Sequence, residues 1–185
     1  WAKENNTFYS EDGCNDVVPI PDPNFELALI NAGIDTNGET GDVLRVEVHN
    51  ITYLNLGGKE ITDLTGLSAF KNLNHLIIYS NPIAEIDLSS NTELEVLQAG
   101  ANELTSLDIS NNPKLRELWA WTNQLESLNT ANNPLLEELW LGQNNITALD
   151  LSNNSNLIGL EIHQNPINSI DFSNSTAFKY SFIKA

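Results

Sequence analysis

Basic residues are scarce in this sequence, which has 8 Lys and Arg against 25 Asp and Glu in 185 residues and a formal net charge of −17. Nucleic-acid backbones and anionic membrane surfaces are bound by Lys and Arg, so this balance argues against both as partners. No stretch approaches the ~20 apolar residues of a membrane helix, so we expect no membrane insertion. The chain has no Met and begins at Trp1. We therefore expect a chain that was processed or trimmed before Trp1, for example by removal of a signal peptide.

Cysteine occurs once, as Cys14, which excludes an internal disulfide. The sequence also lacks a Gly-rich phosphate loop, a nucleophile elbow, and a His and Cys cluster with metal-ligand spacing. These absences remove the commonest signals of an enzyme and of a bound cofactor.

A repeated segment of about 21 residues is the main feature that the sequence does contain. Copies begin at Leu73, Leu94, Leu115, Leu136 and Leu157, and a divergent 22-residue copy begins at Ile51. The shared pattern L-x-x-L-x-L-x-x-N-x-L is typical of leucine-rich repeats. It predicts an α/β solenoid of about six repeats over residues 51–177, curved, with a parallel β-sheet on its concave side.

Three further segments flank the repeats. Residues 1–19 are polar and without period, which predicts an N-terminal extension. Residues 20–50 are predicted to form an N-terminal cap over the open end of the first coil, with a helix at 22–33 and then a strand at 43–48. In that helix Asp22 is the expected N-cap and Gly33 the stop. Residues 178–185 match an incomplete last repeat or a C-terminal cap, and we expect the natural chain to continue beyond Ala185.

Two polar columns recur within the repeats. The Asn at position nine is expected to point inward and to bond backbone groups of the turn, and Lys59 replaces it in the first repeat, where the turn should differ. The Asp of L-x-x-L-D-L-S-N-N recurs as Asp87, Asp108, Asp150 and Asp171. These carboxylates either accept hydrogen bonds from nearby turn amides or bind divalent cations between repeats, and we favour the first alternative.

The segments Ile20-Pro-Asp-Pro-Asn-Phe-Glu and Gly33-Ile-Asp-Thr-Asn-Gly, followed by L-x-x-L-D-L-S-N-N repeats, resemble secreted or surface leucine-rich repeat proteins of Bacteroidetes and flavobacteria. The resemblance covers about residues 20–177. It implies an exported bacterial protein, secreted or on the cell surface, and it implies no activity. This chain departs from the pattern by carrying Trp and other aromatic residues on the predicted concave strands.

The concave face is predicted from strand alternation, which sends positions three, five and seven of each repeat outward. Three Trp side chains then fall on two neighbouring repeats beside carboxylates, as in many binding sites. The alternative is that these rings only pack on one another. The predicted ligand-binding residues are Ile77, Tyr79, Gln98, Glu117, Trp119, Trp121, Glu138, Trp140, Glu161, His163 and Phe182.

A protein or peptide ligand is the first expectation for this face, and a carbohydrate stacked on the Trp rings is the alternative. Glu117 and Glu138 fall at a spacing near that of retaining-glycosidase carboxylates, but nothing in the sequence differentiates their pKa values, so no enzyme is predicted. No cofactor is expected. The loop of Asp35, Asn37, Glu39 and Asp42 is a weak calcium candidate, because a hairpin turn at Asn37-Gly38 explains the same residues.

Overall fold

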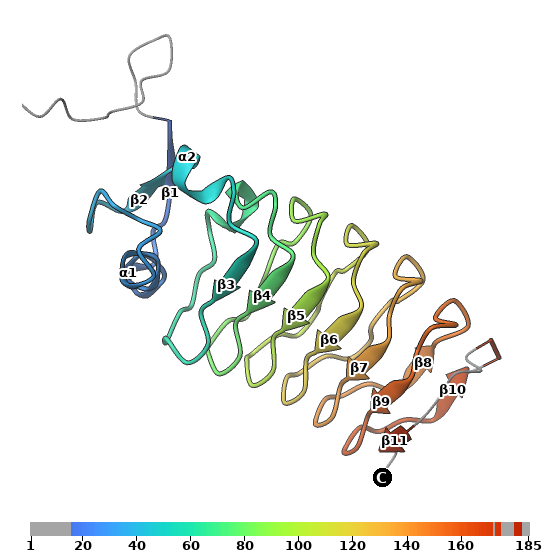
Figure 1. The fold of residues 1–185 in the computed structure, drawn as a ribbon. Helices are drawn as coiled ribbons and strands as arrows, with labels where there is room; N and C mark the ends of the chain where they lie inside the picture. The colour runs from blue at the N-terminus through green and yellow to red at the C-terminus, as the bar shows by residue number, and fades with distance from the viewer. Residues whose placement is uncertain (1–15, 172, 175–179, 183–185) are drawn as a thin grey trace, which may run out of the picture.

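The fold is a solenoid of similar stacked coils, one per repeat (Figure 1). The computed structural model describes residues 16–171, 173, 174 and 180–182. Each coil contributes one short strand to a seven-stranded parallel sheet. In spatial order these strands are β3 (Tyr53–Asn55), β4 (His75–Ile77), β5 (Val96–Gln98), β6 (Glu117–Trp119), β7 (Glu138–Trp140), β9 (Gly159–Glu161) and β11 (Tyr180–Phe182). The leucine-rich repeat solenoid predicted from the repeat pattern is thereby confirmed.

The register of the sheet repeats the period of the sequence, and it determines which side chains enter the core. The central residue of each strand pairs with its counterpart one repeat away, as Leu97 does with Leu118 and Leu118 with Leu139. These leucines are fully buried, and so is the residue two positions later, such as Ala120 directly after β6 or Leu141 directly after β7. Positions three and five of each repeat therefore point to the other face of the sheet.

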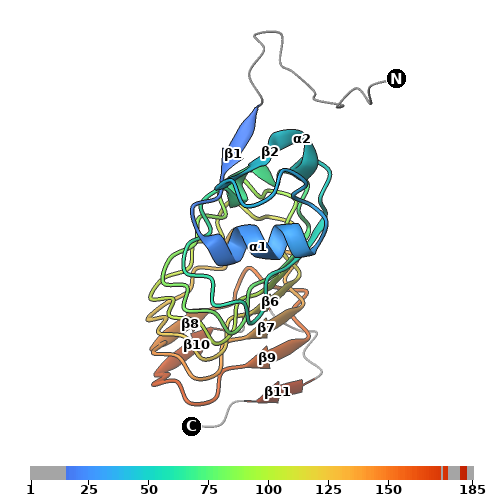
Figure 2. The same cartoon turned by 90° about the vertical axis from the view of Figure 1, so that its left-hand side faces the viewer.

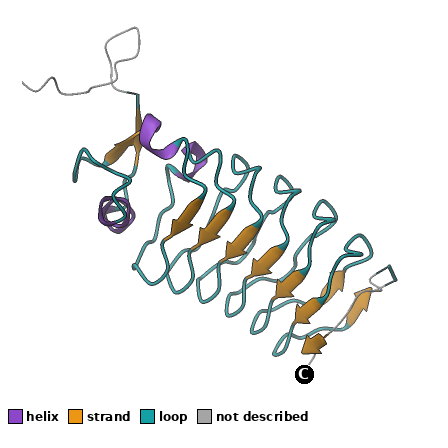
Figure 3. Cartoon of the chain, viewed as in Figure 1, coloured by secondary structure: helices purple, strands orange, loops and turns teal. Residues whose placement is uncertain are grey.

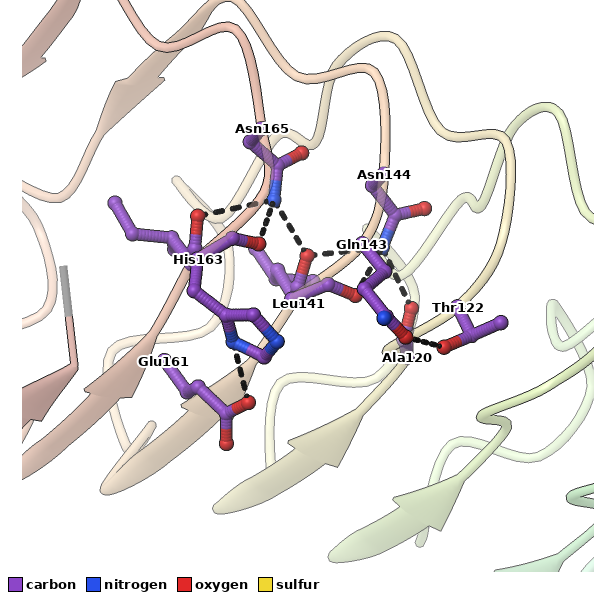
Figure 4. A network of polar contacts seen from close by, with 10 residues as sticks. Ala120, Thr122, Leu141, Gln143, Asn144, Glu161, His163 and Asn165 are labelled. Atoms are coloured by element: carbon purple, nitrogen blue, oxygen red, sulfur yellow. Dashed lines mark hydrogen bonds and ion pairs between the residues drawn. The ribbon is translucent and has the colours of Figure 1, made fainter. Parts of the chain in front are cut away.

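The Asn at position nine lines the inner turn, as predicted. Asn144 is representative: its Nδ2 donates to the carbonyls of Ala120 and Leu141 at 2.9 Å each, and its Oδ1 accepts the N–H of Leu125 at 3.0 Å (Figure 4). The residue before this Asn has a positive φ in five successive repeats, from Ser80 to Gln164. In the first repeat, where Lys59 replaces the Asn, Glu60 also has a positive φ, so this turn differs as expected.

The side of the coil opposite the main sheet holds a second, two-stranded parallel sheet that the sequence pattern does not predict. It consists of β8 (Ala148–Asp150) and β10 (Ser169–Asp171) (Figure 2). Next to it lies the Asp column, in which Asp150 accepts the N–H of Ser152 at 2.9 Å and Asp87 accepts that of Ser89 at the same distance. The favoured assignment of these carboxylates as acceptors for turn amides is confirmed.

The N-terminal cap combines two helices with a small antiparallel sheet and lies against the first coil (Figures 2 and 3). Its elements are β1 (Val17–Pro19), α1 (Pro23–Asn31), β2 (Asp42–Leu44) and α2 (Arg45–Val48), and a 3-10 turn, η1 (Leu67–Ala69), follows β3. Phe25 of α1 packs on Phe70 with ring centroids 6.3 Å apart. This contact joins the cap to the solenoid core.

Asp22 caps α1 as predicted, since its Oδ1 accepts the N–H groups of Asn24 and Phe25. Its Oδ2 accepts the backbone N–H groups of Thr62 and Asp63 and the Thr62 hydroxyl, which belong to the first repeat. Burial alone would raise the pKa of this carboxyl, but these hydrogen bonds outweigh burial and lower it. Gly33 follows the helix with φ 68°, the left-handed conformation expected at its stop.

The structure adds one strand to the predicted cap and shows that one predicted element is wrong. The added strand is β1, which pairs with β2 and buries Val18 opposite Val43. The predicted strand at 43–48 ends at Leu44, where Glu47 turns back to accept the Leu44 N–H and closes a helical turn. The alternating valines of this segment misled the prediction. Residues 1–15, with Trp1 and Cys14, lie outside the described residues.

Candidate functional site

The candidate site lies on the outer face of the main sheet, where positions three, five and seven of each repeat form three columns. Register places Gln98, Trp119, Trp140 and Glu161 side by side in column five, in that order along the sheet. Glu117 and Glu138 are paired in the same way in column three. The columns read from the sequence are thus brought together as neighbours in space.

Trp119 and Trp140 form the centre of the face. Their rings stack with centroids 4.5 Å apart and an angle of 5° between the planes. This separation is close to the spacing of neighbouring strands, so the stack runs along the sheet and each ring covers one face of the other. The indole Nε1 of Trp119 is buried and has no hydrogen-bond partner among the described residues. Such an unpaired donor costs stability and makes this ring a poor choice for a purely structural position.

Column seven alternates a glycine with a large ring, and each ring lies across the glycine of the preceding repeat. A Cβ added at Gly100 would lie 2.4 Å from Cε2 of Trp121, and one at Gly142 would lie 2.4 Å from Cε1 of His163. Tyr79 covers Gly57 in the same manner. Each ring therefore packs directly on the backbone of a glycine, an arrangement that we call the glycine seat. A side chain at that position would collide with the ring, so only glycine allows this contact.

A cavity of about 470 Å³ lies between columns five and seven. We call it the aromatic groove; it is lined by Tyr79, Ser80, Gln98, Gly100, Trp119, Trp121, Trp140 and Glu161. A somewhat larger hollow, of about 520 Å³, lies beside β8 and β10 on the opposite side of the coil. We favour the aromatic groove because its walls are aromatic, whereas the other hollow is lined by small polar and aliphatic side chains.

The electrostatics of the face are acidic. From β3 to β9, positions three, five and seven carry Glu117, Glu138 and Glu161 and no Lys or Arg. Glu161 Oε1 lies 2.7 Å from Nδ1 of His163, and both side chains are partly exposed (Figure 4). Arg116, which directly precedes β6, pairs instead with both carboxylate oxygens of Glu137. The face can therefore accept a positive charge from outside.

The predicted residues differ in how they contribute. Tyr79, Gln98, the three Trp residues and Glu161 line the aromatic groove, and His163 contacts it through Glu161. Glu117 and Glu138 lie on the face outside the lining. Ile77 is only 7% exposed and offers a ligand little surface. The side chain of Phe182 lies outside the described residues. Ser80 lines the groove and was not predicted, since its turn position gives no sequence signal.

Three of the four calcium candidates in the cap contact one another. Asp35 Oδ1 accepts the N–H of Asn37, whose side-chain amide donates to Asp42. Burial raises the pKa of Asp35, which is 3% exposed and whose Oδ2 has no hydrogen-bond partner among the residues that the structure describes. Across the part of the chain that the structure describes, no group of three or more His, Cys, Asp or Glu is arranged to hold a metal ion. Within the same residues, no helix is long and apolar enough to cross a membrane.

Comparison with known proteins finds similar solved structures. No protein-family profile and no curated protein matches the chain. Among solved structures it is similar to the functional domain of InlJ from Listeria monocytogenes, with 31% identity over 89% of this chain and 37% of that one and a TM-score of 0.81. It is also similar to the internalin InlF of the same species, with 26% identity over 89% and 52% of the two chains and a TM-score of 0.78.

A third similar structure is a leucine-rich repeat protein from Leptospira interrogans, with 27% identity over 66% of this chain and 34% of that one and a TM-score of 0.63. The chain thus spans between a third and about half of the length of these proteins. The InlJ domain includes a cysteine ladder, whereas this chain has one Cys and carries an Asn at position nine of its repeats. By its repeat and by its fold, the chain is a leucine-rich repeat solenoid.

Proposed function

We propose that this chain is an interaction module, secreted or on the bacterial cell surface, that binds a protein or peptide through the aromatic groove. The similarity to internalins and to other leucine-rich repeat structures supports an interaction module over an enzyme. The surface location rests on the resemblance of the cap and repeats to exported proteins of Bacteroidetes, which stays a prediction.

The observation that carries the proposal is that three Trp side chains are preorganised on an open sheet. The stack fixes Trp119 and Trp140, and the seat on Gly100 fixes Trp121. Rings that are already immobile lose little rotamer entropy when a ligand binds, and fixed aromatic anchors carry much of the energy of protein interfaces. The buried, unpaired N–H of Trp119 indicates that the cluster was not arranged for stability alone.

A carbohydrate is the second candidate ligand, and the orientation of Trp121 favours it. The indole lies across Gly100 with one broad face on the backbone, which leaves the other face as a platform of the kind that stacks on a sugar. Against a carbohydrate, Trp119 and Trp140 stack on each other and each covers one face of its neighbour. The pair therefore leaves less ring surface free for a sugar than two separate rings would.

The proposal is tested by replacing Trp119, Trp121 and Trp140 together with Ala. A peptide-display selection and a glycan array would be run in parallel on the wild type and the variant. We expect the wild type to enrich a peptide motif and the variant to enrich none. Leu135→Ala is the matched control, since Leu135 is an exposed apolar residue outside the aromatic groove and its loss should change nothing.

Urea denaturation shows whether the triple variant is still folded. Loss of the stack costs about 1 kcal/mol and loss of the area that the three rings bury adds to it, so the solenoid should unfold cooperatively with a lower midpoint. Retained selection of the same motif by the folded variant would refute the proposal. Glycan binding without peptide enrichment would replace it with the carbohydrate alternative.

A further inference from the structure

The aromatic groove runs across the strands rather than along them. Its lining residues come from five neighbouring strands, beginning with Tyr79 after β4 and ending with Glu161 on β9. Four strand spacings of about 4.8 Å give a length of about 19 Å. A peptide in an extended conformation covers about 3.3 Å per residue, so about six residues match the groove.

The two ends of the groove differ in charge. Tyr79, Ser80 and Gln98 line one end and are neutral, whereas Glu161 closes the other end. Its Oε1 is engaged by His163, and its side chain is partly exposed. The groove therefore has a direction, with a negative charge at one end only.

Trp140 and Glu161 are register partners on adjacent strands. Because Trp119 covers one face of the Trp140 ring, the second face of that ring is turned toward the strand that carries Glu161. A planar cation placed there would stack on the indole and meet the carboxylate at the same time. Arginine fits this arrangement better than lysine, since its guanidinium is flat, stacks on aromatic rings and pairs with carboxylates through a fixed fork of donors.

Resting on the proposed function, we infer that the aromatic groove binds an extended peptide of about six residues that carries an Arg at the Glu161 end. The apolar residues of that peptide contact Trp119 and Trp121. The outward positions of β3 to β9 carry no Lys or Arg, so His163, which engages Oε1 of Glu161, is the local competitor for the guanidinium. An acidic peptide is disfavoured by Glu117 and Glu138 on the same face and by the net charge of −17.

The test uses acetylated six-residue peptide amides built from Gly, with one Leu and one Arg placed at every pair of positions. Each has a twin in which citrulline replaces Arg, a change that keeps the shape and removes the charge. Binding is followed by Trp fluorescence and by calorimetry at low salt. We expect the best Arg peptide to bind about tenfold more tightly than its citrulline twin.

Two variants localise the effect. Glu161→Gln should abolish the preference for Arg over citrulline. Glu85→Gln removes the same charge at an exposed position outside the groove, and it should retain the preference. Equal loss in both variants would show that net charge alone attracts the peptide and would overturn the inference.

The remaining outcomes separate this inference from the proposed function. Peptides that bind in the groove without a preference for Arg leave the proposed function intact and overturn the inference. Binding of glycans together with no binding of any peptide overturns both.

Discussion

Gly100→Ala is the sharpest probe of the site, because it moves one ring without removing any atom of the groove. The added Cβ would lie 2.4 Å from Cε2 and 2.6 Å from Nε1 of Trp121, where ordinary contact begins at 3.4 Å. The indole must therefore retreat by at least 1 Å from its seat. The backbone itself tolerates the change, since the φ of Gly100 lies outside the left-handed region.

The expected magnitudes differ for stability and for binding. Loss of the ring contact costs about 1 kcal/mol, and the restriction of the unfolded chain by Ala returns about 0.4–1 kcal/mol, so the free energy of unfolding should change by less than about 1 kcal/mol. Displacement of an aromatic anchor should cost about 2 kcal/mol in binding, which is a loss of affinity of about 30-fold.

Near-ultraviolet circular dichroism reports the displaced indole, urea denaturation reports stability, and titration with a selected peptide reports affinity. Gly142→Ala is the matched control, because its Cβ would push His163 and leave Trp121 in place. It should alter the Glu161 pair without changing the Trp spectrum. An unchanged spectrum and an unchanged affinity in Gly100→Ala would refute the packing of Trp121 on Gly100 and its role in binding.

Two further predictions concern hydrogen bonds that stabilise the solenoid and its cap. Thr130→Val removes a hydroxyl whose single hydrogen is shared between Asn154 Oδ1 at 2.7 Å and the Asp150 carbonyl at 3.1 Å. The change should lower the free energy of unfolding in urea by about 1 kcal/mol, although Val is the more apolar residue; an unchanged midpoint would show that this hydroxyl adds nothing. Asp22 has a lowered pKa in the folded protein, so its contribution to stability is full above the unfolded value of about 4 and is lost as the pH falls through the folded pKa. Asp22→Asn should therefore be less stable at pH 7 and lose less stability between pH 5 and pH 2 than the wild type, which parallel thermal melts would reveal; identical pH profiles would contradict this role.

The limits of sequence reasoning are clearest in the cap. The N-cap at Asp22 follows from local hydrogen-bond chemistry, and it was predictable. The segment after Leu44 was mispredicted because its alternating valines fit a strand, whereas the Glu47 carboxylate captures the Leu44 N–H and starts a helical turn. Val46, the middle residue of that pattern, is 54% exposed. A side chain that reaches back to the backbone leaves no trace in hydrophobic periodicity.

The sequence by itself determined the solenoid, because a 21-residue period with fixed Leu and Asn positions buries the same atoms in every coil. It also determined which residues share the outer face, since strand alternation and a constant register leave no freedom there. Only the tertiary structure decided how the rings lie on that face. Trp119 and Trp140 stack on each other, while Trp121 lies across the glycine of the preceding repeat. These ring orientations depend on the space between neighbouring repeats, which the sequence of one repeat does not specify.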